Sequence, residues 1–464
     1  MRPNILLLLP DQHRGDWLDL PHGLPSAAGP PELRMPVLRS IMERGTVFSQ
    51  AVSPSPICAP ARACLATGTR YFQCGVPDNT SNFNPSSRTF YQDLRNAGYA
   101  VMSAGKLDLH KATKYWGEAG WIDDLGEIGF TSAVDNEGKL DAIIGSMKEE
   151  PGNPTGRIEG FIDLESQHRR GPYIRYLHDR GKAAYHVADM RRRLENPRDV
   201  ELTELADEDY CDNWLTQNAL ELLDSVGPGA PWFLQVNFTG PHDPWDITRE
   251  MARSIEGRDF GVPHRGDPEH TETDRRIRAH YGAMLENIDR NIGRLLGAVE
   301  RRHESESTVV IYASDHGEML GDRGRFGKSI PDRASSGVPL VIGGGPAGSC
   351  GMDSSLVELQ DLAATILDFA GCDTSAYPQS RSLLGRLAGT GEVHREVQVS
   401  ALGSWRMIRN EDWTCIDYGD RCSLHANTGE ASDEDSDLAL ENRLIAEDLR
   451  RRMDAEFEHA ERVG

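Results

Sequence analysis

The chain has 464 residues, a length that fits one large domain together with a smaller one. Its formal net charge of −23 argues against nucleic acids and anionic membrane surfaces as partners. No run reaches the roughly 18 consecutive apolar residues of a membrane span. A small anionic substrate stays open as a partner, provided that cations gather locally in a pocket.

The N-terminal stretch MRPNILLLLPDQ contains a short apolar run that is followed directly by charged and polar residues. A secretory signal peptide would need a small-residue cleavage site at that point. We therefore expect a buried strand here and a cytoplasmic protein. The eight cysteines are scattered and form no CxxC pair, so we expect reduced thiols and no structural zinc site.

Several apolar runs along the chain end in polar or charged residues. They cover residues 4–9, 99–104, 232–238, 308–313 and 338–342. Continuous apolar strands suit a parallel sheet that is buried on both faces. Because ligand sites of open α/β sheets lie beyond the carboxyl ends of the strands, we expect the polar residues after these runs to converge.

Helical patterns alternate with these strands. Apolar residues at three- and four-residue spacing predict an amphipathic helix over residues 277–299, and residues 214–223 predict another. The alternation predicts an α/β layered sandwich over residues 1–390. Within that region, residues 147–200 are polar and weakly periodic, so we expect an insertion or lid.

The pattern of apolar and turn-forming residues changes near residue 391. Short strand-like segments separated by turn residues follow, and a charged helix is predicted over residues 438–457. Residues 391–464 therefore predict a small C-terminal α+β subdomain with an antiparallel sheet.

Asp11 and Asp315 each follow a buried strand, and each precedes a second candidate ligand, Gln12 or His316. A buried carboxylate is costly unless it is paired or bound to a cation. Oxygen-rich donor sets with one amide or imidazole suit Ca²⁺, Mg²⁺ or Mn²⁺. Taken singly, each aspartate could instead cap the turn after its strand. The matched placement of the two aspartates favours a divalent metal.

Residues 58–68, CAPARACLATG, place a cysteine, a proline and an arginine at a predicted helix start. Pro60 fits the first helical turn. Arg62 and a helix N-terminus would both lower the pKa of the Cys58 thiol and attract an anion. The plainer alternative is a small buried cysteine beside a surface arginine, and composition alone favours it because free cysteines are usually buried.

The same stretch resembles the type I sulfatase signature, C-x-P-x-R followed by L-x-T-G, with Ala61 where the family usually has Ser. Other segments are similar to further motifs of that family, in the same order along the chain. They are PNILLLLPDQ, AGYAVMSAGK, GPHDPW, SDHGEMLGDRGRFGK and WRMIRNEDW. The resemblance covers nearly the whole chain. It implies an alkaline-phosphatase-like sandwich with a large, mostly parallel central sheet flanked by helices.

The resemblance implies that Cys58 is oxidised to formylglycine by a formylglycine-generating enzyme. The aldehyde hydrate would offer two hydroxyls: one attacks sulfur and displaces the alcohol, and the other loses its proton and expels sulfate. Asp11, Gln12, Asp315 and His316 would hold the metal beside Cys58, with Ca²⁺ expected ahead of Mg²⁺ or Mn²⁺.

The resemblance also implies roles for cationic and polar residues. Arg62 would steady the nucleophile. Lys106 and Lys328 would clamp the sulfate oxygens, and His242 would lie near the leaving-group oxygen or the sulfate. Asn79 would contact the sulfate or the hydrate, or it would simply support its local turn.

Two departures from the common family pattern bear on the substrate. Metal motifs of the form DQ and DH resemble those of choline sulfatases and phosphonate monoester hydrolases. The sequence GKLD at residues 105–108 stands where many sulfatases have GKWH, and it resembles arylsulfatase K-like members, which act on sulfated uronic acids. Asp108 or the nearby His110 would then handle the proton of the nucleophile.

The expected activity is hydrolysis of a sulfate monoester on a small or sugar-linked alcohol. Retention of Lys106 favours sulfate over phosphonate esters. A phosphonate monoester or phosphodiester hydrolase on the same fold is the main alternative. A binding protein with an unmodified Cys58 is less favoured, because every residue type that the site needs is present.

Overall fold

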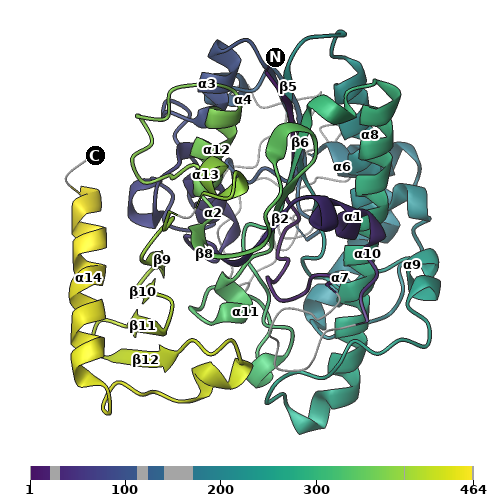
Figure 1. Ribbon diagram of the computed structural model, residues 1–464. Helices are drawn as coiled ribbons and strands as arrows, with labels where there is room; N and C mark the ends of the chain where they lie inside the picture. Colours follow the sequence, from purple (N-terminus) through teal and green to yellow (C-terminus); the bar gives the residue numbers. More distant parts are fainter. Residues whose placement is uncertain (1, 21–31, 112–123, 141–170, 391, 462–464) are drawn as a thin grey trace.

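The computed structural model describes residues 2–20, 32–111, 124–140, 171–390 and 392–461 (Figure 1). Its centre is an eight-stranded sheet in the order β4-β3-β5-β1-β6-β7-β2-β8. The strands of this sheet are β1 (Asn4–Leu8), β2 (Thr46–Val52), β3 (Ala100–Gly105), β4 (Ser132–Asp135), β5 (Trp232–Asn237), β6 (Thr308–Ala313), β7 (Leu340–Gly343) and β8 (Gly351–Glu358). All five runs predicted as strands appear in it.

Most neighbouring strands in this sheet run parallel, from β4 through β3, β5 and β1 to β6, and again between β2 and β8. The expectation of a parallel strand at residues 338–342 is wrong, because β7 runs antiparallel to both β6 and β2. A continuous apolar run indicates that both faces of a strand are buried, but it carries no information on strand direction.

Helices cover both faces of the sheet, because successive strand side chains point to opposite sides. Ile5 and Leu7 belong to a core cluster with α2, α3 and α12, whereas Leu6 and Leu8 belong to one with α1, α8 and α10. Figure 1 shows α12 and α2 on one side of the molecule and α8 and α10 on the other. This is the layered sandwich expected from the sequence.

The helices vary widely in length. They are α1 (Pro36–Arg44), α2 (Cys58–Thr67), α3 (Phe90–Asn96), α4 (Asp124–Ile128), α6 (Pro172–Asp179), α7 (Ala183–Glu195), α8 (Cys211–Asp224), α9 (Arg249–Ser254), α10 (Thr271–Arg301), α11 (Arg333–Ser336), α12 (Asp361–Phe369), α13 (Leu384–Leu387) and α14 (Arg443–Glu461). The two helices predicted over residues 214–223 and 277–299 are the central parts of α8 and α10. Within the described ranges, no helix is both long and apolar enough to cross a membrane.

A four-stranded antiparallel sheet and α14 form the C-terminal part of the described chain (Figure 1). The strands are β9 (Gln398–Leu402), β10 (Trp405–Arg409), β11 (Trp413–Asp417) and β12 (Cys422–Ala426). Ile408 of the sheet and Met453 of α14 join the core cluster that includes α2 and α12. The small C-terminal α+β unit is confirmed, and its boundary near residue 391 stays a prediction.

The predicted insertion or lid at residues 147–200 is described only in part, since residues 147–170 lie outside the described ranges. Residues 171–200 contain α6 and α7, which the weak periodicity did not predict. Tyr173 of α6 is buried, and its ring centroid lies 5.3 Å from that of Trp214 in α8. The described half of this region therefore packs on the core, and a lid role stays a prediction.

Because the core clusters supply most of the stability of such a sandwich, a buried leucine and an exposed leucine in helices should respond differently to truncation. Leu285 of α10 is fully buried, whereas Leu444 of α14 is 81% exposed. We expect Leu285→Ala to lower the free energy of unfolding by about 2–5 kcal/mol and Leu444→Ala to change it by less than about 0.5 kcal/mol. Denaturant unfolding of both variants tests this, and equal effects would contradict the packing described above.

Candidate active site

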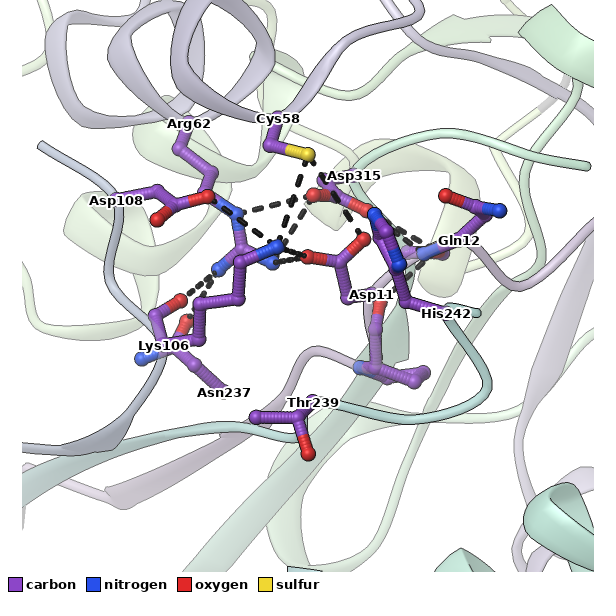
Figure 2. A network of polar contacts seen from close by, with 12 residues as sticks. Asp11, Gln12, Cys58, Arg62, Lys106, Asp108, Asn237, Thr239, His242 and Asp315 are labelled. Atoms are coloured by element: carbon purple, nitrogen blue, oxygen red, sulfur yellow. Dashed lines mark hydrogen bonds and ion pairs between the residues drawn. The ribbon is translucent and has the colours of Figure 1, made fainter. Parts of the chain in front are cut away.

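The carboxyl ends of four central strands bring polar side chains together. The strands β3, β5, β1 and β6 are neighbours and run parallel, so their carboxyl ends share one edge of the sheet. Lys106 follows β3, His242 follows β5, Asp11 follows β1 and Asp315 follows β6. Figure 2 shows these side chains gathered beside Cys58. The structure thus brings together the strand-end residues that the sequence singled out.

Four of these side chains form a compact group of metal-ligating type. One donor atom from each of Asp11, Cys58, Asp315 and His316 lies within 4.8 Å of every other, and all four residues are buried. The Cys58 Sγ lies 3.3 Å from His316 Nε2, which is 3.7 Å from an oxygen of Asp11. Two fully buried carboxylates require compensating positive charge, so the donor set fits a divalent cation.

Gln12 adjoins this group through several hydrogen bonds. Its backbone N–H donates to Asp315 Oδ1 at 3.1 Å, and its side-chain Oε1 accepts from Lys328 Nζ at 2.5 Å. Its Nε2 donates to Glu318. The amide oxygen therefore faces the cationic side of the site, where it can also serve as a metal ligand.

Cys58 occupies the first position of α2, where the sequence placed a helix start. The preceding residue, Ile57, has no side chain that can cap the helix, and Asn79 Oδ1 instead accepts from the Ala59 N–H at 3.0 Å. Gly68 ends the helix in the left-handed conformation with φ of 63°. Asn79 thus supports the helix that presents Cys58, while a direct contact with substrate stays a prediction.

Two lysines balance the charge around the thiol. Lys328 Nζ lies 3.3 Å and Lys106 Nζ 3.8 Å from Cys58 Sγ. Burial raises the pKa of Cys58, and so does the Asp11 carboxylate. The two ammonium groups outweigh both effects, and the pKa of the Cys58 thiol lies well below its usual value. The site therefore favours an anionic group at this position.

Arg62 lies one helical turn after Cys58 on the same face of α2. Its guanidinium contacts Asp315 Oδ2 at 2.9 Å and Asp11 Oδ2 at 3.3 Å, and it donates to Asn237 Oδ1 at 3.1 Å. These contacts direct Arg62 to the two carboxylates. The predicted role of Arg62 in steadying the nucleophile stays a prediction.

His242 pairs with its neighbour Asp243 at the edge of the site. The distance from His242 Nδ1 to Asp243 Oδ1 is 3.0 Å. Burial and Lys328 lower the pKa of His242. The carboxylates of Asp243 and Asp11 outweigh them and raise that pKa to about 9, so His242 is protonated at neutral pH.

The segment after β3 holds the two residues predicted to handle a proton. The Asp108 carboxylate lies 3.3 Å from Lys106 Nζ and also pairs with Lys111. Asp108 has a φ of 58°, a left-handed backbone conformation that aspartate adopts more readily than most residues with a side chain. His110 is buried two residues further on. The structure therefore places Asp108 against the site lysine, and the proton-handling roles stay predictions.

Sequence reasoning missed Glu318, Asp243 and Asn237. Glu318 is buried, bonds Gln12 and accepts from the Gly327 N–H at 2.6 Å. Burial, aided by Asp243, raises the pKa of Glu318 to about 7. The only signal for these three residues in the sequence was their position inside or beside the motifs. That position did not indicate that their side chains would contact residues far away in the chain.

A family profile described as "Sulfatase" matches residues 3–372. The chain is similar to an arylsulfatase of Clostridium perfringens, with 26% identity over 405 residues that cover 80% of this chain and 75% of the relative. It is 27% identical to a choline-sulfatase of Rhizobium meliloti over 80% of this chain and 68% of that one. It is 24% identical to human arylsulfatase K over 94% of this chain and 78% of the relative.

Among solved structures, the phosphonate monoester hydrolase of Agrobacterium radiobacter aligns with a TM-score of 0.73. The alignment covers 99% of this chain and 96% of that one at 19% sequence identity. Identity at that level shows a shared fold.

The His242–Asp243 pair predicts a specific titration. In metal-free protein, we expect Asp243→Asn to lower the pKa of His242 from about 9 toward its ordinary value of about 6.5. Because the folded-state pKa is raised, the stability from this pair is complete below about pH 6.5 and is lost as the pH rises through about 9. NMR titration of labelled histidines measures both variants. Asp224→Asn, at the exposed end of α8, serves as the control, and an unchanged pKa of His242 in Asp243→Asn would contradict the pairing.

Proposed function

The chain belongs to the sulfatase family, and we propose that it hydrolyses a sulfate monoester of a small or sugar-linked alcohol. The nucleophile is formylglycine derived from Cys58, and the metal is Ca²⁺. This proposal rests mainly on the environment of Cys58 Sγ. Polar atoms of four side chains lie 3.3–3.9 Å from this sulfur, and they belong to His316, Lys328, Lys106 and Asp11.

The metal proposal rests on the donor set. Asp11, Asp315, His316 and the Gln12 amide offer mainly oxygen atoms, which Ca²⁺ prefers, and Mg²⁺ or Mn²⁺ would accept the same donors. A bound divalent cation supplies Lewis-acid polarisation of a sulfate oxygen and favours the ionised nucleophile. Arg62 holds both carboxylates in place from the side of α2.

The cations of the site suit a sulfate group beside Cys58. Lys106 and Lys328 approach Cys58 from two different segments, so each can bind a different non-bridging oxygen of the ester. Because charge on these oxygens changes as the ester breaks, fixed donors of this kind stabilise the transition state. Protonated His242 can then donate its proton to the departing alcohol oxygen.

Maturation of Cys58 requires a partner. We propose that a formylglycine-generating enzyme recognises residues 58–62, CAPAR, before the chain folds, because Cys58 is fully buried in the folded structure. The small anionic substrate is the second partner, and its entry is favoured by the local cations in spite of the acidic chain as a whole.

A phosphonate monoester hydrolase is the second candidate, since the fold is shared with a protein of that name at a TM-score of 0.73. The same metal and lysines would bind a phosphonate oxygen as readily as a sulfate oxygen. Paired assays with phenyl sulfate and phenyl phosphonate esters separate the two. Faster cleavage of the sulfate ester supports our proposal, and much faster cleavage of the phosphonate ester overturns it.

Mass spectrometry of protein from its native host tests the nucleophile. The tryptic peptide 45–62 contains Cys58 as its only cysteine, and the adjoining peptide 63–70 contains Cys64. We expect the first peptide to be lighter than its sequence mass by about 18 Da, the difference between a thiol and an aldehyde side chain. Cys64 is the internal control and should keep its thiol. An unmodified Cys58 in active protein would contradict a formylglycine mechanism.

Loss of one cation should slow the reaction without unfolding the protein. We expect Lys106→Ala to reduce kcat/KM for the sulfate ester by about 10²–10³-fold, since it removes a donor that acts on the reacting group. Lys182→Ala, at an exposed position, is the matched control and should retain full activity. Equal rates for wild type and Lys106→Ala would remove this lysine from the reaction.

A further inference from the structure

Two cysteines outside the active site lie in contact on the C-terminal sheet. Cys415 of β11 and Cys422 of β12 place their Sγ atoms 2.8 Å apart. The antiparallel register pairs Cys415 with Leu424 and Asp417 with Cys422, so the two thiols lie on the same face of the hairpin as diagonal neighbours. The sulfur atom of Cys415 also lies 4.0 Å from the carbonyl oxygen of Ala446 in α14.

We propose that Cys415 and Cys422 are an oxidative modification site, which forms a disulfide across the β11–β12 hairpin. A cystine has a sulfur–sulfur distance of about 2.05 Å, so the thiols need to approach by only roughly 0.8 Å. The site differs from Cys58 in chemistry and in place, and it does not depend on the proposed sulfatase reaction. It departs from our expectation that all thiols of this chain stay reduced.

The two thiols have unequal roles in this reaction. Cys422 is partly exposed, whereas Cys415 is fully buried. A hydrogen bond between them lowers the pKa of Cys422, while the same contact and burial raise the pKa of Cys415. Cys422 is therefore the thiol that a reagent in solution meets first and the one that ionises more easily.

A small-molecule disulfide, such as oxidised glutathione, supplies the oxidising equivalents. The Cys422 thiolate attacks one sulfur of the reagent, which forms a mixed disulfide and releases one glutathione thiolate. Cys415 then loses its proton, attacks Cys422 Sγ and displaces the second glutathione. The reagent is reduced to two thiols, and the protein loses two hydrogen atoms.

We expect this disulfide to affect the stability of the protein more than its catalytic activity, because the opposite face of the hairpin is the one directed to the large domain. Thr414 and His425 line a cavity of about 60 Å³ between this sheet and the large domain. The cysteines lie on the other face, beside α14. A disulfide therefore restrains the hairpin from the α14 side, and no active-site residue is part of it.

Contact between two thiols, one of them partly exposed, distinguishes this pair from the other cysteines of the described chain. Cys64 and Cys74 interact as well, but both are buried, so a reagent in solution cannot reach either one. Cys350 is exposed and Cys372 is partly exposed, and they provide a measure of non-specific oxidation.

The test uses the full chain, treated with oxidised glutathione, alkylated and digested with trypsin. Cys415 lies in peptide 410–421 and Cys422 in peptide 422–443, so the disulfide appears as these two peptides linked, about 2 Da below their summed mass. The midpoint of thermal unfolding should rise by about 1–3 °C on oxidation and return on reduction. Alkylation of both cysteines in the treated wild type would overturn the proposal.

Single variants test the order of the two steps. Cys415→Ser should stop at a glutathione adduct on Cys422, because no second thiol displaces it. Cys422→Ser should gain no adduct on the buried Cys415. Cys350→Ser is the matched control and should still form the linked peptides. An adduct on Cys415 in Cys422→Ser, or linked peptides that join Cys350 to Cys372 in preference, would contradict the assignment.

Discussion

The site depends on a pair of carboxylates, Asp11 and Asp315, that are both without solvent exposure. Two such charges cannot stay buried side by side unless cations balance them. Arg62 contacts Asp315 at 2.9 Å and Asp11 at 3.3 Å, and Lys106 pairs with Asp11 as well. This balance leaves oxygen atoms of Asp11 and Asp315 close to Cys58 and His316. The two buried carboxylates are therefore also the oxygen donors of the candidate metal site.

The architecture meets this constraint with two kinds of element. The parallel strands β1 and β6 are neighbours, which brings their following aspartates together from positions about 300 residues apart in the chain. The helix α2 then sets Cys58 and Arg62 four residues apart on one face, so one rigid element presents both the proposed nucleophile and the guanidinium that neutralises the carboxylates. The cap from Asn79 fixes the end of that helix, and the relative placement of thiol and metal ligands follows from helix geometry.

The sequence could predict the features that depend on residues close together in the chain, but not those that depend on distant partners. Apolar runs and helical spacing depend on local residues, and they predicted the central strands, α8, α10 and the start of α2. Strand β12, with the mixed pattern CSLHA, and helix α7, rich in arginine, have no such local signal. In α7 the buried Arg193 pairs with Asp189, so its polar residues are compatible with burial only because of that partner. Glu318 was missed for the same reason, since its partner Gln12 lies 306 residues away.

The contacts of Gln12 explain why an amide fits at this position. Its φ of 72° is a strained conformation for a residue with a side chain, and it persists because the surroundings hold it. Tyr281 donates to its carbonyl oxygen at 2.7 Å, Glu318 accepts from its Nε2, and Lys328 donates to its Oε1. The amide offers a donor toward Glu318 and an acceptor toward Lys328. A carboxylate at residue 12 would face the carboxylate of Glu318. The side chains at residues 12 and 318 therefore depend on each other. The acceptor that Gln12 offers to Lys328 also helps to hold this lysine toward Cys58.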